Sequence, residues 1–217
     1  WEAARVRLRR ATVAAAVGIL ALVPFAPIAI LGVPAAHDLP DHTAMASQFL
    51  AGLAEGRLYP RWCGDFSRGW GDATGQYYPP GLYYLTAATS SAIGLLPGPS
   101  GRPADERVIL GLFAALGAVT LVGMAGTYRL VRPLAGPGAA LVACAALSVA
   151  PYRYVELCHA GLLSAYAAGC LVPWLLLAVV RIAENPWWPR ARSFTRPAAG
   201  YAVVWALIAL TNLPTLV

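Results

Sequence analysis

The sequence predicts an all-α membrane protein, on the basis of its composition, the lengths of its apolar runs and the placement of its charges. Of the 217 residues, 59% are apolar and only 12% are charged, whereas soluble globular domains average about 45–50% apolar and about 25% charged residues. This composition excludes a disordered chain, a small disulfide-rich domain and most nucleic-acid-binding modules. The expected fold is therefore a bundle of apolar helices, with the bilayer as its main partner and no nucleic acid bound.

Five runs of apolar sequence are long enough to cross a bilayer as α-helices. They cover approximately residues 11–33, 108–128, 135–152, 160–181 and 198–217. A signal peptide is the alternative for the first run, but its apolar region exceeds the usual length and four further runs follow it, so we expect an anchor that is retained. Because the chain stops within the fifth run, we expect residues 1–217 to be the N-terminal part of a longer multispan domain.

A sixth charge-free run, residues 81–97, is shorter and contains Thr, Ser, Gly and Tyr. Cytoplasmic loops of membrane proteins are rich in Arg and Lys. If residues 81–97 do not cross, then the N-terminus and the basic segments 129–132 and 181–196 all face the cytoplasm, with net charges of +8 inside and −2 outside. We therefore expect an interfacial helix here, a short tilted span being the alternative. On this topology, the basic isoelectric point of the chain comes from the arginine-rich segments on the cytoplasmic side and reflects the orientation of the protein in the membrane.

Residues 34–107 form one long polar loop on the outer side, and seven of the ten acidic residues lie in it. Near its start, apolar residues recur at spacings of three and four, which predicts an amphipathic helix over residues 39–55 that lies along the membrane surface. Asp38 is the expected N-cap of this helix. Loops on rigid scaffolds commonly carry function, so the candidate site is expected in this loop.

Asp38, Asp41 and His42 have the spacing that places side chains on one face of a helix. A carboxylate in such a cluster is suited to general-base catalysis. Asp38 and Asp41 could also bind a divalent cation such as Mg²⁺ or Mn²⁺, with His42 contacting substrate. The alternative interpretation is a helix start that is capped and carries no site.

The middle of the loop combines aromatic residues with glycine and proline, which indicates an irregular backbone. Aromatic faces such as those of Trp62 and Tyr78 are suited to stacking on sugar rings. An interfacial aromatic belt explains the same residues equally well.

Arg61 and Arg68 could bind a phosphate group through bidentate hydrogen bonds. Two alternatives remain open from the sequence: contact with anionic lipid headgroups, and ion pairs with Asp65 and Asp72.

The second outer loop carries Arg153, Glu156 and His159 one helical turn apart. On the non-crossing topology this loop faces the same side as Asp38, so all three are candidate site residues. The structural alternative is an ion pair between Arg153 and Glu156.

The order of motifs resembles one bacterial family. The HD-type acidic motif is followed by "GRLYPRW", by "YYPPGLYYL" and later by "APYRYVEL". This order is similar to the membrane proteins catalogued as 6-pyruvoyl-tetrahydropterin synthase-related, which resemble GT-C superfamily glycosyltransferases such as the protein O-mannosyltransferases and the aminoarabinose transferases. The resemblance implies a GT-C-like helical bundle in the bacterial inner membrane, with juxtamembrane helices in its long outer loop.

The resemblance also implies an activity, namely transfer of a sugar from a polyprenyl-phosphate donor to an acceptor at the outer face. Asp38, with Asp41 beside it, would be the base or metal contact, and Glu156 the second acid. The chain departs from the family pattern at Ala160-Gly161 and at Thr211-Asn212. A non-catalytic role, as a transporter or as a glycan-binding or assembly factor, is the alternative function.

Overall fold

The computed structural model describes residues 2–94, 104–184 and 191–212, and the regular elements in these ranges are all helical. No strand occurs in them, and an isolated bridge between Cys63 and Asp72 is the one β-type pairing found there. The all-α class predicted from composition is therefore confirmed for the described residues.

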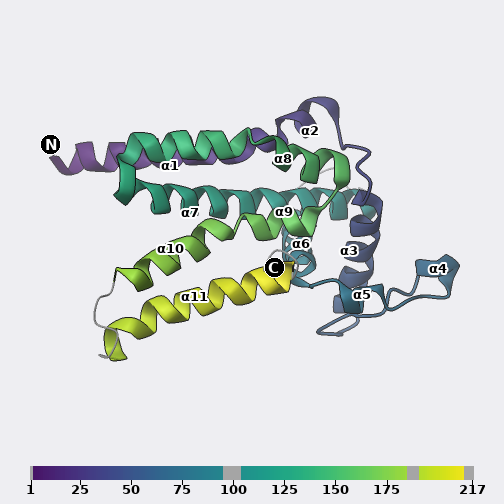
Figure 1. The fold of residues 1–217 in the computed structure, drawn as a ribbon. Helices are drawn as coiled ribbons and strands as arrows, with labels where there is room; N and C mark the ends of the chain where they lie inside the picture. Colours follow the sequence, from purple (N-terminus) through teal and green to yellow (C-terminus); the bar gives the residue numbers. More distant parts are fainter. Residues whose placement is uncertain (1, 95–103, 185–190, 213–217) are drawn as a thin grey trace.

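Long helices lie side by side and form the body of the molecule (Figure 1). The first runs through a 3-10 turn, η1, into the short helix α2, because Pro24 and Pro27 stand near the N-terminal ends of these elements, where proline is tolerated. The elements of this body are α1 (Glu2–Leu22), η1 (Val23–Phe25), α2 (Ala26–Leu31), α7 (Ala104–Ser148), α9 (Leu163–Gly169), α10 (Val172–Ala183) and α11 (Ala191–Thr211).

Helix α7 consists of two arms that meet at Gly136, where the chain turns back on itself (Figure 1). Gly136 has a φ of 84°, which favours glycine, and the following Pro137 disfavours a helical conformation in the residue before it. The predicted spans 108–128 and 135–152 thus both fall largely within α7, with the turn between them.

Three helical stretches are long and apolar enough to cross a membrane: Ala4–Leu31, Glu106–Ser148 and Leu163–Ala183. Ala198–Thr211 is apolar but shorter, and residues 213–217 of the predicted fifth span lie outside the described residues. This finding is consistent with a membrane protein.

The basic segments gather at one end of the body. Figure 1 places the N-terminus, the turn at Gly136, the end of α10 and the start of α11 at the same end. Under the positive-inside rule that end faces the cytoplasm, and this orientation remains a prediction.

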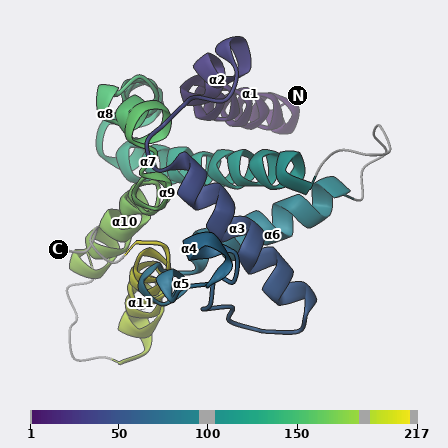
Figure 2. The ribbon, with the colours of Figure 1, turned by 90° about the vertical axis from the view of Figure 1, so that its right-hand side faces the viewer.

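At the opposite end, two helices run crosswise to the long ones (Figures 1 and 2). They are α3 (Leu39–Ala54) and α6 (Gly81–Gly94), where interfacial helices were expected over residues 39–55 and 81–97. Residues 95–97 lie outside the described part, and the depth of both helices in a bilayer stays a prediction.

The crosswise helices share a small core of their own with the loop between them. Met45, Ala46 and Phe49 of α3 pack with Tyr83 of α6 and Cys63 of the loop. Buried aromatic and aliphatic area is the main source of stability in such a cluster. The loop between α3 and α6, which includes α4 (Phe66–Gly69) and α5 (Thr74–Tyr77), is thereby fixed to this end of the molecule.

Candidate functional site

Backbone hydrogen bonds join the start of the first outer loop to the end of the second. The amide of His37 donates to the carbonyl of His159 at 3.0 Å, and the amide of Asp38 donates to the carbonyl of Ala160 at 3.0 Å. Two loops more than a hundred residues apart in sequence are therefore held together where the predicted acidic motif begins.

Gly161 completes this contact. Its φ is +75°, and a Cβ at this position would stand 2.9 Å from the backbone nitrogens of both Asp38 and Leu39. A side chain is excluded there by the close approach and disfavoured by the backbone conformation. The junction of the two loops thus requires glycine at this position.

Asp38 occupies the N-cap position of α3 but does not cap the helix with its side chain. Its φ and ψ of −94° and 0° differ from the extended conformation that a capping residue usually adopts. Instead its Oδ1 lies 2.5 Å from Nδ1 of His37. This hydrogen bond, followed by the carboxylate charge, raises the pKa of His37. The Asp38 side chain is 31% exposed and so is accessible to a ligand.

His42 does not join Asp38 and Asp41 in a cluster of three accessible side chains. Asp41 is exposed, whereas His42 is only 3% exposed and its Nδ1 lies 2.9 Å from the hydroxyl of Tyr83. Among the described residues no group of three or more His, Cys, Asp or Glu side chains could hold a metal ion. Mg²⁺ is commonly held by one or two carboxylates together with water and substrate phosphates, so binding of Mg²⁺ or Mn²⁺ by Asp38 and Asp41 stays a prediction.

His42 instead links the two crosswise helices. Burial lowers its pKa, so the imidazole is neutral at pH 7. Its ring lies edge-on to Tyr78, with centroids 6.0 Å apart, and near Tyr83 at 6.1 Å. The hydrophobic partners of α3 turn His42 inward, which the spacing of polar residues alone did not reveal.

The second loop carries two buried ionisable residues close together. Arg153 ends α8 (Pro151–Tyr154), and Glu156 lies in the π-helical turn η2 (Val155–Ala160). They are 7% and 8% exposed, yet no ion pair within 4.0 Å joins them. The ion pair between Arg153 and Glu156, the structural alternative for these two residues, is therefore not formed in this structure.

Arg153 is held by other partners. Its Nη1 donates to Sγ of Cys170 at 3.4 Å, and its guanidinium lies 4.9 Å from the centroid of the Tyr166 ring. The Tyr166 hydroxyl is 2.9 Å from Oγ1 of Thr120. Tyr166 of α9 and Cys170 directly after it thus hold the guanidinium, most of whose N–H donors have no partner among the described residues.

Glu156 has no hydrogen bond or ion pair to any described residue. Burial raises its pKa to about 7, against the opposing influence of the Arg153 charge. A carboxyl with a pKa near neutrality can both accept and donate a proton at pH 7, which suits general acid–base chemistry. His159, the third candidate of this loop, is exposed and contributes its backbone carbonyl to the loop junction.

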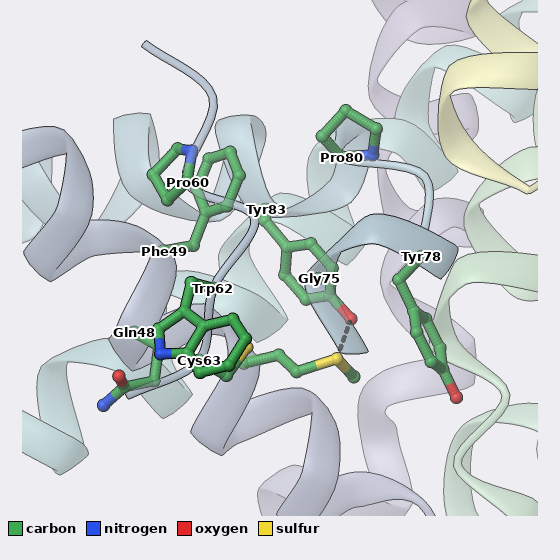
Figure 3. A pocket seen from close by; sticks show the side chains of 10 residues that line it. Gln48, Phe49, Pro60, Trp62, Cys63, Gly75, Tyr78, Pro80 and Tyr83 are labelled. Atoms are coloured by element: carbon green, nitrogen blue, oxygen red, sulfur yellow. Dashed lines mark hydrogen bonds between the residues drawn. The ribbon is translucent and has the colours of Figure 1, made fainter. Parts of the chain in front are cut away.

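The aromatic loop places its predicted residues at the surface. Arg61, Trp62 and Arg68 are exposed. Figure 3 shows Trp62 and Tyr78 on either side of a pocket that Tyr83 also lines. Its volume of about 10 Å³ is that of a packing gap and admits no sugar ring.

A larger groove runs along α3 beside the acidic motif. It has a volume of about 560 Å³ and begins at Leu39 and Pro40, between the two aspartates. It continues past Ser47 to Asp65 and Ile109, so that apolar and polar groups both line it. This groove is the described cavity nearest to Asp38 and Asp41 in sequence.

The sequence analysis did not identify Gly161, Thr120, Tyr166 or Cys170 as site residues. Thr120 and Tyr166 are polar residues within otherwise apolar runs, and such residues in a predicted span are a usable signal because they need a hydrogen-bond partner. The role of Gly161 depends on its contact with a loop that is distant in the sequence, so no pattern in the neighbouring residues predicts it. In comparisons with known proteins, no family model, curated protein or solved structure matched this chain.

Proposed function

We propose that this chain belongs to a membrane glycosyltransferase of the GT-C type, which transfers a sugar from a polyprenyl-phosphate donor to an acceptor at the outer face of the bacterial inner membrane. One observation carries the proposal: the junction of His37–Asp38 with His159–Ala160 sets an accessible carboxylate beside the loop of Glu156 and Arg153. The order of motifs in the sequence supplies the reaction class.

The groups at the junction are those that glycosyl transfer needs. Asp38 accepts the proton of an acceptor hydroxyl, whose oxygen attacks the anomeric carbon of the donor sugar. The bond from that carbon to the phosphate oxygen breaks, and the polyprenyl phosphate leaves with the electron pair. Arg153, fixed on Tyr166 and Cys170, stabilises the negative charge of the leaving phosphate.

Glu156 is the second carboxyl of the proposed site. Because its pKa is about 7, the Glu156 carboxyl can donate a proton to a group in the proposed site, or accept one from it, at neutral pH. Each step of the proposed mechanism is assigned to a side chain of this protein.

The groove along α3 is the proposed entry for substrate. Its lining begins with Leu39 and Pro40, which stand between Asp38 and Asp41 in the sequence, and the same helix is the one predicted to lie along the membrane surface. Apolar and polar side chains both line the groove, which suits a lipid-linked sugar with an apolar prenyl chain and a polar head.

The test is transfer by the full-length protein in liposomes that contain radiolabelled polyprenyl-phosphate sugars. Asp38→Asn and Glu156→Gln should each lower the transfer rate at least about 100-fold, as expected for the loss of general acid–base catalysis. Glu55→Gln is the matched control, because Glu55 is an exposed carboxylate already paired with Arg57. Unchanged transfer by both site variants, at wild-type protein levels, would remove the catalytic roles of Asp38 and Glu156. Absence of transfer by the wild-type protein would favour a non-catalytic role.

A further inference from the structure

Residues 61–77 of the aromatic loop form a compact tip, in which α4 projects farthest from the long helices (Figure 1). Two backbone hydrogen bonds between Cys63 and Asp72, of 3.0 and 3.1 Å, close its base. The amide of Gly71 donates to the carbonyl of Phe66 at 2.9 Å within the tip. These hydrogen bonds therefore hold the backbone of the tip in a defined conformation.

The two carboxylates of the tip are used internally. Asp65 accepts a hydrogen bond from the side-chain amide of Gln48. Asp72 accepts from the amide of Thr74 at 2.9 Å, and hydrogen bonds from Thr74 lower the pKa of Asp72. Neither forms an ion pair within 4.0 Å with an arginine of the described residues, so the alternative of ion pairs with Arg61 and Arg68 does not hold in this structure.

The two arginines of the tip are consequently left facing solvent as cations without a carboxylate partner. Arg61 lies over the ring of Tyr59 at 5.5 Å, an exposed contact that leaves its charge available. Arg68 adopts a φ of 61° and the preceding Ser67 a φ of 53°. Two successive non-glycine residues in the left-handed region are strained, and such strain is concentrated at functional sites.

The same tip also carries exposed aromatic side chains. Trp70 is 87% exposed and Trp62 is 52% exposed, and the Trp62 indole is so close to Gly71 that a Cβ there would lie 2.5 Å from Nε1. Trp62 thus has one face supported by the tip and presents the rest of its ring to solvent. Tyr77, at the end of the tip, is also 83% exposed.

We propose that the tip binds an anionic glycan. Arg61 and Arg68 would bind its carboxylate or phosphate groups, and the indoles of Trp62 and Trp70 would stack on its sugar rings. The tip projects away from the long helices, so a soluble polymer is a better fit than the headgroups of the surrounding bilayer. This inference rests on the proposed function, because the anionic glycan would be the acceptor of the transferred sugar.

The experiment measures binding of sugars by the full-length protein in nanodiscs of zwitterionic lipid. The probes are oligogalacturonate, which is anionic, and a maltooligosaccharide of equal length, which is neutral. We expect the anionic probe to bind at least about 10-fold more tightly. Arg68→Ala and Trp70→Ala should each weaken its binding about 10-fold, and Trp70→Tyr should retain most of it because a ring remains.

Arg57→Ala is the matched control for charge. Arg57 lies just before the tip, and its Nη2 is already 2.5 Å from Glu55, so its removal should leave binding unchanged. Equal binding of the two probes, or an equal loss in Arg57→Ala, would overturn the proposal. So would binding that survives in Arg68→Ala and Trp70→Ala proteins with unchanged melting temperatures.

The same preparations separate this inference from the proposed function. Glu156→Gln should abolish transfer while leaving oligogalacturonate binding intact. Binding by a wild-type protein that transfers no sugar would support the glycan site and remove the enzymatic role. Transfer by a protein that shows no binding preference for the anionic probe would support the enzymatic role and remove the glycan site.

Discussion

Gly161 lies directly against the backbone amide of Asp38, although 123 positions separate the two residues in the sequence. The contact is possible because glycine has no Cβ and because the chain takes a left-handed turn as it leaves the π-helical turn η2. The amide of Asp38 is then free to bond the carbonyl of Ala160. The position of the first carboxylate of the candidate site is thereby coupled to the loop that carries the second.

Gly161→Ala should break this coupling. The added Cβ would stand 2.9 Å from two backbone nitrogens in a conformation that alanine disfavours. We expect a loss of about 1–3 kcal/mol in the free energy of unfolding, together with reduced glycosyl transfer. Thermal unfolding and transfer assays on the same preparation measure both effects.

Gly56→Ala is the matched control for backbone conformation. Gly56 also has a positive φ, +84°, but nothing lies within 4 Å of the position of its Cβ. It should lose less stability and keep full activity. Equal losses in the two variants would mean that backbone strain alone, and not the contact with Asp38, explains the effect.

Glu156→Gln should change how stability depends on pH. The pKa of Glu156 is about 7 in the folded protein against an ordinary value of 4.5, so the unfolded chain loses this proton first. The folded state therefore becomes less stable as pH rises from about 4.5 to about 7. Removing the buried charge should stabilise the protein above pH 7 by on the order of 2 kcal/mol and have little effect near pH 4.5.

The measurement is the difference in melting temperature between Glu156→Gln and wild type across pH 4.5 to 8. It should grow with pH and level off above about 7. A difference that does not vary with pH would show that Glu156 titrates at an ordinary value and has no special protonation chemistry.

His42→Gln should also change how stability depends on pH, but in the opposite direction to Glu156→Gln. Burial lowers the pKa of His42 below 6.5, so the unfolded chain binds a proton more readily than the folded protein does. Wild-type stability from this group is present above pH 6.5 and is lost as pH falls. Glutamine can keep a hydrogen bond to Tyr83 but cannot titrate, so the variant should lose less stability on acidification than wild type.

The melting temperature of His42→Gln relative to wild type should thus rise as pH falls from 7 to 5. Because Glu156 stabilises the wild-type protein over the same range, the two effects partly cancel, and only the single variants separate them. A direct substrate role for His42 would instead lower transfer at pH 7 with no change in this pH dependence.

The sequence predicted the elements of this fold better than it predicted the candidate site. Apolar runs and their lengths depend on local composition, so the helical class and the approximate helix positions could be read from them. The helix starting at Leu39 follows from periodicity, and the turn at Gly136 follows a Gly-Pro pair that was not identified in advance.

Side-chain partners were harder to predict because they depend on segments far apart in the chain. Spacing placed Asp41 and His42 on neighbouring positions of one helix, but Tyr83 draws only His42 into the core. An ion pair between Arg153 and Glu156 was reasonable at their spacing, yet Tyr166 and Cys170 of the next helix hold the guanidinium instead. Neither preference is visible without the packing.

Tyr166 offers the last test, since it supports Arg153 in two separable ways. Its ring lies under the guanidinium at 4.9 Å, and its hydroxyl is 2.9 Å from Thr120. Tyr166→Phe removes only the hydroxyl and should cost about 1 kcal/mol of stability with a small loss of transfer. Tyr166→Leu also removes the ring and should lower transfer at least about 10-fold beyond Tyr166→Phe, with a raised KM for the phosphate-bearing donor, because Arg153 is no longer held in place. Equal transfer rates in the two variants would mean that the ring does not position Arg153, and that Cys170 and the surrounding packing suffice to hold it.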